Sequence, residues 1–379
     1  MADKKSLRLL ISCGGTGGHF NPGLGIAKHL NELGGSSLLL LGGKHAPGQK
    51  ITAEKQNVDA VTFTFDRPGK NPAAMIRFLF SVIRGYRTAK RLFREFRPDA
   101  VLIMGSSVSL PPALAAHWNH IPVFLHEGNA KVGKANRFLS RWADTAALSF
   151  PAVNSGSLRS ASVVTGFPLR TALTDCRLTR EEAFDRINRT WNTSFDPAKP
   201  LILVFGGSLG ARNINMNFDA DPADPRVKDL QVIHLAGPGR ANELRTKYDA
   251  FPCAALLLES CSEMEVLYTA ADAVVSRAGG STVSEIAFFG KYALLIPYPY
   301  AAEDHQNDNA RFLASAGGAE ILSDRQATKE AFRSFVSRFL ADVGEYRKKG
   351  RASLSLARPD AADAVLRMIA DRLTILSGR

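Results

Sequence analysis

The chain of 379 residues is too long for one ordinary hydrophobic core, so its length predicts two domains. A hydrophobic fraction of 45% and a charged fraction of 22% are typical of globular proteins, and no apolar run reaches the roughly 18 residues that a membrane-spanning helix needs. The net charge of +12 predicts an anionic partner, which the charge alone leaves open between nucleic acid, an anionic membrane surface and a diphosphate ligand.

The cysteines carry no sign of a metal site or of disulfide pairing. Cys13, Cys176, Cys253 and Cys261 are scattered, without the spacing of zinc ligands. This pattern is typical of a reducing compartment such as the cytosol, so neither structural zinc nor a disulfide is expected.

The amino-terminal part begins with a strand, a glycine-rich turn and a helix. Residues 7–12 form an apolar run of the parallel-sheet kind, residues 13–19 (Cys-Gly-Gly-Thr-Gly-Gly-His) follow it, and residues 22–33 are expected to be helical. The turn is neither a Walker A loop nor a dinucleotide fingerprint, but its glycines let the backbone approach an anion. His19 ends the turn, and it is either a candidate base or a helix-capping imidazole.

Strands and helices continue to alternate through the first half. Further strands are expected over residues 37–41, 58–65, 100–104, 121–126, 145–149 and 162–165. Two of them lead into polar turns, Gly105-Ser106-Ser107 and His126-Glu127-Gly128-Asn129. Residues 166–170 break the alternation and are expected to link two domains.

Residues 72–96 are expected to form a long helix with two different faces. At 3.6 residues per turn, one side carries Met75, Leu79, Val82, Ile83, Tyr86 and Phe93, and the other carries Arg77, Arg84, Arg87 and Arg91 with Phe80 among them. A basic face with an embedded aromatic ring is typical of a helix lying on a membrane surface. A solvated basic surface is the alternative.

The second half repeats the α/β pattern. Strands are expected over residues 201–205, 231–236, 255–258, 273–275 and 293–296, with a glycine turn at residues 206–211 and a helix near Asn213. The tail from Asp360 is amphipathic and is expected to be a helix that packs back on the amino-terminal domain. The expected division is a domain over residues 1–166, a second over 167–345, and a helical tail over 346–379.

The stretch from Ser276 to Ala287 is the strongest local signal. It follows the strand at 273–275 and enters a helix expected over residues 283–289, so backbone N–H groups and the positive end of the helix dipole face whatever lies in front. A phosphate or diphosphate is the natural guest. Glu285, one turn inside, is placed to accept two hydrogen bonds from a ribose diol; a capped helix with a solvated glutamate is the alternative.

These turns all follow the carboxyl ends of strands, which is where doubly wound sheets bind ligands. The sequence therefore predicts two doubly wound α/β domains with a nucleotide-diphosphate site in the cleft between them. Five motifs carry a family resemblance: Gly14-Gly15-Thr16-Gly17-Gly18-His19, His126-Glu127-x-Asn129, Gly206-Gly207-Ser208-Leu209-Gly210-Ala211, Thr282-Val283-Ser284-Glu285 and Asp304-His305-Gln306-x-x-Asn309-Ala310.

Together the motifs resemble the MurG family of N-acetylglucosaminyltransferases. The resemblance implies a GT-B fold, in which two Rossmann-like parallel-sheet domains face a central cleft. It implies an inverting transfer of GlcNAc from UDP-GlcNAc to the 4-hydroxyl of undecaprenyl-diphospho-N-acetylmuramoyl pentapeptide. Lipid I would thereby become lipid II, with a β-1,4 linkage, in peptidoglycan synthesis.

The resemblance also implies the residues that bind the donor. These are Thr16, Gly17, Gly18, Asn129, Arg170, Ser208, Cys261, Gly280, Ser281, Thr282, Val283, Ser284, Glu285 and Gln306. Among them, Arg170 and Ser208 would hold the diphosphate, Cys261 would lie beside the uracil, and Gln306 would bond the sugar.

Two motifs depart from the family pattern. Gly105-Ser106-Ser107 stands where the family usually has a Gly-x-Gly-Gly-Tyr turn, which is associated with the acceptor diphosphate. Gly128 stands where the family usually has glutamine. Donor recognition is therefore better supported than acceptor recognition.

The expected mechanism follows from charge. Departure of UDP leaves negative charge on its phosphates, and the helix start at Ser281, with Ser208 and Arg170, is suited to stabilise it, so neither a metal nor a cofactor is expected. His19 is the candidate base for the acceptor hydroxyl, with His126 and Glu127 in reserve.

The lipid acceptor accounts for the basic charge. Phe80, Arg84, Arg87 and Arg91 are expected to meet the anionic inner leaflet, which predicts a peripheral protein on the cytoplasmic face of the plasma (inner) membrane.

Three alternatives remain at this stage. One is a UDP-sugar glycosyltransferase with a different lipid acceptor, and another is a non-hydrolysing UDP-GlcNAc 2-epimerase, which needs no acceptor. The third is a non-catalytic nucleic-acid-binding protein. The sequence disfavours it and predicts no nucleic-acid partner, because there is no recognised nucleic-acid module and the basic residues are not interleaved with exposed aromatics along a sheet.

Overall fold

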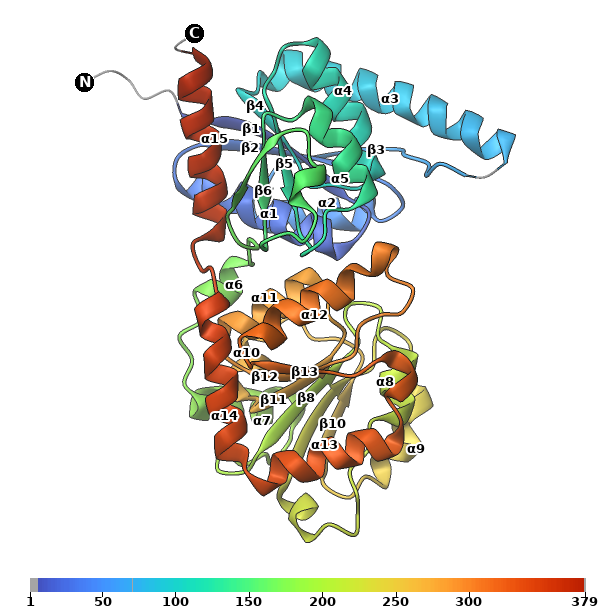
Figure 1. Cartoon of the computed structure of the whole chain (residues 1–379), viewed down its shortest axis with the longest axis vertical. Helices are drawn as coiled ribbons and strands as arrows, with labels where there is room; N and C mark the ends of the chain where they lie inside the picture. The colour runs from blue at the N-terminus through green and yellow to red at the C-terminus, as the bar shows by residue number, and fades with distance from the viewer. Residues whose placement is uncertain (1–5, 70, 378–379) are drawn as a thin grey trace, which may run out of the picture. The chain divides into compact units, whose positions relative to one another are not determined.

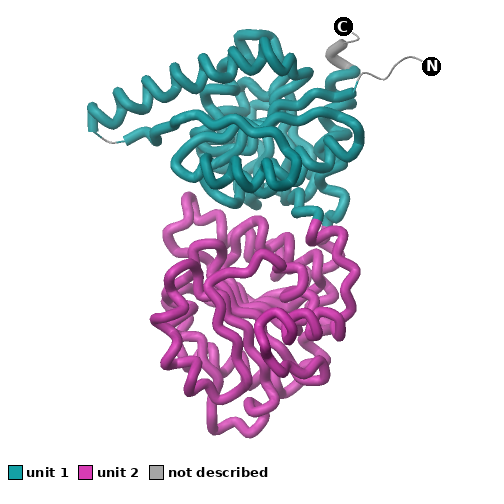
Figure 2. The backbone as a smooth tube through the Cα atoms, turned by 180° about the vertical axis from the view of Figure 1, so that it is seen from behind, with its two compact units in different colours: residues 1–171, 358–379 teal, residues 172–357 magenta. Residues whose placement is uncertain are grey.

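The computed structural model describes residues 6–69 and 71–377 (Figure 1). The chain divides into two compact units (Figure 2). Unit 1 comprises residues 1–171 and 358–379, and unit 2 comprises residues 172–357. The boundaries between the units lie at 171/172 and 357/358. The sequence analysis had expected domain boundaries at 166/167 and 345/346.

Unit 1 is built on a parallel sheet of seven strands, in the order β3-β2-β1-β4-β5-β6-β7. The strands are β1 (Arg8–Gly14), β2 (Ser36–Gly42), β3 (Ala60–Phe63), β4 (Ala100–Ile103), β5 (Val123–Glu127), β6 (Thr145–Leu148) and β7 (Ala161–Val164). Helices cover both faces of the sheet, which explains why its central strands are continuous apolar runs rather than alternating ones. All seven strands expected in this part of the chain are confirmed, with shifted ends.

The helices of unit 1 are α1 (Gly17–Glu32), α2 (Ala46–Glu54), α3 (Pro72–Phe96), α4 (Leu110–Trp118), α5 (Lys134–Leu139) and α15 (Ala361–Ser377). α3 has the predicted bounds, and its amino-terminal half extends away from the rest of unit 1 (Figures 1 and 2). α15 packs against α1 through Val365, Leu366 and Ile369, which belong to the same core as the first strand. α1 starts at Gly17, so the expected start at residue 22 is wrong: Pro22 lies inside the helix, and extended Thr16 is the N-cap.

Residues 166–170, the expected interdomain linker, directly precede the division at 171/172 and are packed against unit 1. Phe167 and Leu169 are only 4% and 7% exposed. A side chain on Gly25 would bring its Cβ within 3.0 Å of the Leu169 carbonyl, so the segment lies directly on α1. The linker residues therefore belong to the packed body of unit 1.

Unit 2 contains a parallel sheet of six strands, in the order β10-β9-β8-β11-β12-β13. The strands are β8 (Leu201–Phe205), β9 (Gln231–Leu235), β10 (Ala254–Leu258), β11 (Ala273–Ser276), β12 (Tyr292–Leu295) and β13 (Ala319–Ile321). The first five were predicted and are confirmed. The sequence analysis missed β13, which has only three residues.

Helices surround this second sheet on both faces (Figure 1). They are α6 (Thr171–Thr174), which starts at the unit boundary, α7 (Arg180–Trp191), α8 (Arg212–Asn217), α9 (Ala241–Asp249), α10 (Met264–Ala270), α11 (Gly280–Phe288), α12 (His305–Ser315), α13 (Lys329–Ala341) and α14 (Val343–Ala352). Two doubly wound parallel α/β units are thus confirmed.

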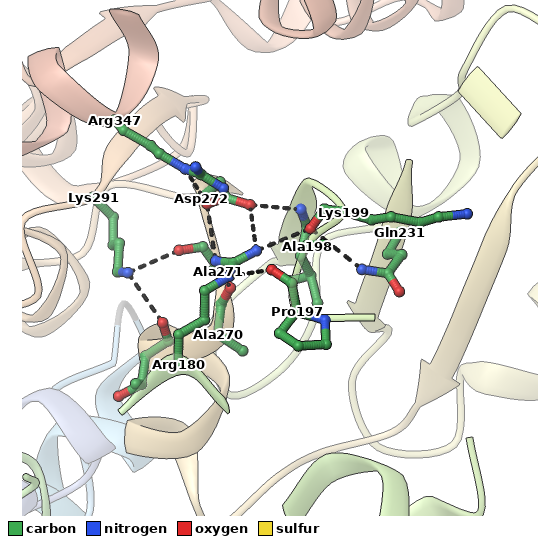
Figure 3. A network of polar contacts seen from close by, with 12 residues as sticks. Arg180, Pro197, Ala198, Lys199, Gln231, Ala270, Ala271, Asp272, Lys291 and Arg347 are labelled. Atoms are coloured by element: carbon green, nitrogen blue, oxygen red, sulfur yellow. Dashed lines mark hydrogen bonds and ion pairs between the residues drawn. The ribbon is translucent and has the colours of Figure 1, made fainter. Parts of the chain in front are cut away.

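A polar network joins the amino ends of strands in unit 2 (Figure 3). The Asp272 side chain is 3% exposed, accepts two hydrogen bonds of 2.9 Å from Arg180, and accepts one of 2.7 Å from Arg347 Nε. The Lys291 ammonium donates to the Ala271 carbonyl at 2.8 Å, and burial lowers the pKa of Lys291 to about 8. Ligands of such sheets bind at the opposite, carboxyl edge, so this network stabilises the fold rather than forming a site.

Candidate functional site

In unit 1, the turn after β1 is shaped by glycines. Gly14 and Gly15 have φ angles of +131° and +81°, and a Cβ on Gly14 would lie 2.7 Å from the Gly42 carbonyl oxygen. Only glycine is accepted there. The chain then enters α1, whose first helical residues are Gly17 and Gly18. The turn therefore presents the amino end of a helix, a natural site for an anion.

His19 lies in the first turn of α1 and is linked to the N-cap residue. Its Nδ1 lies 3.0 Å from Thr16 Oγ1. The Thr16 carbonyl also accepts the backbone N–H of His19 at 3.2 Å. The imidazole is half-buried, and proton transfer to a ligand would use Nε2, because the threonine contact occupies Nδ1.

His126, a reserve candidate for the base, is packed inside unit 1. It is 1% exposed, its Nε2 lies 3.1 Å from Ser149 Oγ, and Phe167 contacts the ring edge-on. Burial, with a smaller contribution from nearby His19, lowers the pKa of His126 to about 3. The neutral, enclosed ring is suited to holding β5 in place.

Glu127, the other reserve candidate, is 3% exposed and accepts four hydrogen bonds. The donors are the backbone N–H groups of Asn129 and Gly133, at 3.0 Å each, and the side-chain amides of Asn129 and Asn136, at 3.1 and 2.8 Å. Burial raises the pKa of Glu127, and these hydrogen bonds oppose the rise. The carboxylate therefore positions Asn129.

The two turns of unit 1 that carry donor-binding candidates lie together. A Cβ on Gly128 would lie 3.9 Å from the Gly18 carbonyl oxygen and 3.2 Å from the Phe167 ring. The turn after β5 therefore lies against the first turn of α1. A side chain at position 128 would therefore require Phe167 to move by a few tenths of an ångström.

The turn after β4 is strained at the departure from the family pattern. Gly105 has φ +90°, and its Cβ position lies 2.8 Å from Asn136 Oδ1. Ser106 has φ +70° and ψ 159°, a conformation nearly restricted to glycine. Ser107 then begins a short 3-10 turn. At Ser106 the backbone of the turn therefore has a conformation that glycine adopts easily but serine does not.

In unit 2, the turn after β8 is also forced by glycines. A Cβ on Gly206 or on Gly210 would lie 2.1 Å from the backbone of Ala211 or Ala236, respectively. This close packing turns Ser208 outward, where it is exposed. The structure thus places Ser208 at the carboxyl edge of the second sheet, as the sequence predicted.

The start of α11 lies at the same edge. The helix begins at Gly280 with Gly279 as an extended N-cap, so the expected start at 283 is wrong by almost one turn. Ser281, Thr282 and Gly280 therefore form its first turn, whose N–H groups lack helical acceptors. Val283 is fully buried and packs against the core.

Glu285 is held by two hydroxyl groups. Ser281 Oγ donates to its Oε1 at 2.6 Å, and the Tyr268 hydroxyl donates to its Oε2 at 2.9 Å. Sequence reasoning missed Tyr268, which comes from α10 and is fully buried. Its only sequence signal is an aromatic residue within an amphipathic segment, which core packing explains equally well.

Residues of α12 tie down the turn before α11. Gln306 Oε1 accepts from the Tyr298 N–H at 2.9 Å and from the Ala278 N–H at 3.3 Å. Asn309, which is fully buried, donates to the Ala278 carbonyl at 3.0 Å. Because its oxygen binds the backbone, Gln306 would offer a ligand its amide Nε2.

The remaining predicted donor contacts are less defined. Cys261 is half-buried before α10 and is reduced, and Arg170 is half-buried at the end of unit 1. Among the described residues, no three His, Cys, Asp or Glu side chains are grouped as a metal site would require.

Each unit thus carries glycine turns and a helix start at the carboxyl edge of a parallel sheet, and two such units in one chain are typical of GT-B nucleotide-sugar enzymes. Models of the glycosyltransferase family 28 N-terminal and C-terminal domains match residues 9–148 and 201–365. The chain belongs to glycosyltransferase family 28, and it is a hexosyltransferase.

Curated relatives agree over the full length. A protein of Geotalea uraniireducens is 32% identical over 364 residues, covering 95% of this chain and 97% of the relative. One of Pelobacter propionicus is 32% identical over 374 residues, covering 95% and 98%. Both are named UDP-N-acetylglucosamine--N-acetylmuramyl-(pentapeptide) pyrophosphoryl-undecaprenol N-acetylglucosamine transferase. The resemblance to the MurG family is confirmed.

Solved structures share the fold. Acinetobacter baumannii MurG has a TM-score of 0.72 and 27% identity, covering 96% of this chain and 99% of that chain. A UDP-GlcNAc 2-epimerase from Neisseria meningitidis, bound to UDP-GlcNAc, has a TM-score of 0.68 at 13% identity, covering 96% and 100%. At that identity, the second likeness shows the fold alone.

Proposed function

We propose that this protein transfers GlcNAc from UDP-GlcNAc to the 4-hydroxyl of undecaprenyl-diphospho-N-acetylmuramoyl pentapeptide, forming the β-1,4 linkage of lipid II for peptidoglycan synthesis. The observation that carries the proposal is the 32% identity over 95% of the chain to a transferase named for this donor and this acceptor. The motif residues support it, because they lie at the carboxyl edges of the two sheets.

The donor is held mainly through its UDP part. The first turn of α11 offers backbone N–H groups and a helix dipole to the diphosphate. Glu285 accepts from the ribose diol, and Gln306 donates its amide hydrogens to the sugar. Arg170 and Ser208 add a cation and a hydroxyl donor, Asn129 adds a side-chain amide, and Cys261 lies beside the uracil.

The chemical step is a single displacement. The acceptor oxygen attacks the anomeric carbon of GlcNAc, and the bond from that carbon to the β-phosphate oxygen breaks with its electron pair going to UDP. The hydroxyl proton moves to His19 Nε2. Donors fixed around the departing diphosphate stabilise the charge that develops there without reorganising, and the proposal assigns no metal or cofactor to the step.

Membrane association follows from α3. Its amino-terminal half exposes Met75, Ile76, Leu79, Phe80 and Ile83, which are between 41% and 62% exposed. Arg84, Arg87 and Arg91 are exposed along the same helix. The buried face of α3 consists of Ser81, Gly85, Ala89, Leu92 and Phe93. Of the side chains expected on the apolar side, Phe93 is buried, whereas Met75, Leu79 and Ile83 are exposed together with Phe80.

An exposed apolar group flanked by arginines fits a bilayer surface better than water. We infer peripheral binding to the anionic cytoplasmic face of the plasma membrane, where the lipid acceptor resides. No described helix is long and apolar enough to cross a bilayer.

The epimerase alternative shares the fold and is separated by its chemistry. An epimerase converts UDP-GlcNAc without an acceptor, whereas the proposed transferase releases UDP only when an acceptor is present. Measuring UDP release with and without a lipid I analogue tests the proposal. Acceptor-dependent release supports it, and conversion of UDP-GlcNAc to its 2-epimer without acceptor contradicts it.

A further inference from the structure

Glu285 is the only carboxylate within α11 (Gly280–Phe288) as the structure describes it, and two other side chains set the position of its head group. Ser281, one turn earlier on the same helix, donates to Oε1 at 2.6 Å. Tyr268, on α10, donates to Oε2 at 2.9 Å. A glutamate side chain has three rotatable torsions, so two donors on separate oxygens restrict both its reach and the plane of its carboxylate.

Tyr268 is itself rigid. It is fully buried, its ring stacks on Phe289 at a centroid distance of 5.2 Å and 13°, and Phe205 contacts it edge-on at 6.1 Å. Phe205 ends β8 and Phe289 caps α11, so the tyrosine is fixed by elements on both sides. A hydroxyl on such a ring donates in one direction, and here that direction is Glu285.

We propose that Tyr268 is a positioning residue for nucleotide recognition: it fixes the Glu285 carboxylate in the orientation that accepts both hydroxyls of a ribose. This rests on the proposed function, in which Glu285 binds the diol. An ionised carboxylate has about four acceptor positions, so one carboxylate accepts several hydrogen bonds at once. Selectivity for a ribonucleotide then depends on a residue that does not touch the ligand.

The contact with Glu285 also determines which group of Ser281 can bind a diphosphate. Its hydroxyl is directed at Glu285, so its contribution to a bound diphosphate comes from its backbone N–H in the first turn of α11. Ser281 and Tyr268 thus each hold one oxygen of the Glu285 carboxylate.

The test is a binding comparison of two ligands, UDP and 2′,3′-dideoxy-UDP, which lacks both ribose hydroxyls. Calorimetry gives the ratio of their dissociation constants for wild type, Tyr268→Phe, Glu285→Gln and the double variant. Tyr268→Phe removes only the hydroxyl and keeps the stacked ring. A matched control is Tyr292→Phe, a buried tyrosine of the same unit that packs against Tyr346.

For Tyr268→Phe, we expect UDP to bind roughly tenfold more weakly, with 2′,3′-dideoxy-UDP changed less than twofold, so the ratio falls. In the Glu285→Gln background, the second substitution should leave the ratio unchanged. Equal weakening of both ligands, or an unchanged ratio in Tyr268→Phe, overturns the proposal. If wild type itself does not discriminate the two ligands, the ribose assignment of Glu285 in the proposed function fails instead.

Discussion

Thr16 Oγ1 and His19 Nδ1 lie 3.0 Å apart at the start of α1. For His19 to accept a proton at Nε2, its Nδ1 must carry the hydrogen and donate it to the threonine oxygen. The threonine oxygen can accept that hydrogen, so the contact is compatible with the tautomer that a general base needs. It also ties the proposed base, His19, to the same turn that presents the amino end of α1.

Replacing His19 with alanine tests the base directly. We expect kcat to fall by about 10² to 10⁴, the usual contribution of general base catalysis. The dissociation constant of UDP-GlcNAc should stay within about twofold, because none of the proposed diphosphate or ribose contacts is removed. Steady-state kinetics with a lipid I analogue, together with calorimetry, provide both values. Turnover like that of wild type would remove His19 from the mechanism.

Thr16 should matter through the imidazole that it orients. Thr16→Val keeps the shape but removes the hydroxyl, and we expect kcat to fall roughly tenfold, the value of one hydrogen bond of this kind. Thr16→Ser keeps the hydroxyl and serves as the matched control, with near wild-type turnover. In the His19→Ala background, Thr16→Val should have no further effect on kcat; an additive loss would mean that Thr16 acts independently of His19.

Ser106 should be a site where glycine stabilises the fold. Its φ of +70° with ψ of 159° lies in a region that side chains disfavour by about 1 to 3 kcal/mol. Ser106→Gly should therefore raise the unfolding free energy by roughly 1 kcal/mol, even though glycine usually destabilises. Thermal unfolding measures the change. Ser107→Gly, in the adjoining 3-10 turn, is the control that should be neutral or destabilising; the same sign for both variants would contradict the strain.

Acid should destabilise unit 1 through His126. Burial lowers the pKa of His126 to about 3 in the folded state, against an ordinary histidine pKa of 6.5. Between these values the unfolded chain binds a proton that the folded chain does not, so stability falls as pH decreases through this window. From pH 7 to pH 5 the loss from this histidine is roughly 2 kcal/mol.

The measurement is denaturant unfolding at several pH values in a Trp191→Phe background. The other two tryptophans, Trp118 and Trp142, then report on unit 1. His126→Asn should flatten the pH dependence whatever its absolute stability, whereas His45→Asn, at an exposed position of unit 1, should leave the slope unchanged. A slope unaffected by His126→Asn would refute this account of acid sensitivity.

Binding to anionic vesicles should depend on the exposed end of α3. Phe80 is 62% exposed, and Phe80→Ser should weaken vesicle binding roughly tenfold, since it removes the aromatic side chain that would enter the interface. Arg84→Gln should cost about fivefold at low salt and less at high salt, because it removes one cation near the surface. Leu33→Ser, at a leucine that is 61% exposed elsewhere in unit 1, is the control. Salt-insensitive binding in vesicle sedimentation would count against the electrostatic part.

The strands and their glycine turns were predictable because parallel strands covered on both faces are continuous apolar runs, as at Leu201–Phe205. Helix starts were harder. Pro22 and Val283 looked like first helical residues, but the glycines before them, Gly17 and Gly280, adopt helical geometry once an extended N-cap precedes them. The three residues of β13 are too few to show a period.

The residues that contact a site side chain could be predicted only where both residues belong to the same sequence motif. Glu285 could be singled out because its helix follows a glycine turn, and Ser281 lies one turn away from it. Tyr268 could not, because it reaches Glu285 from another helix, 17 residues earlier in the chain, and only tertiary packing brings the two together. The burial of His126 and the four donors on Glu127 are likewise properties of the folded loop rather than of the motif.

The most direct test of the central claim is to identify the product formed from UDP-GlcNAc and a lipid I analogue. Mass spectrometry and NMR of the purified lipid should show one added GlcNAc, joined through a β-1,4 linkage to the muramoyl sugar, with one UDP released for each sugar transferred. An unmodified acceptor, or a sugar attached at another hydroxyl or with the opposite anomeric configuration, would contradict the proposed function.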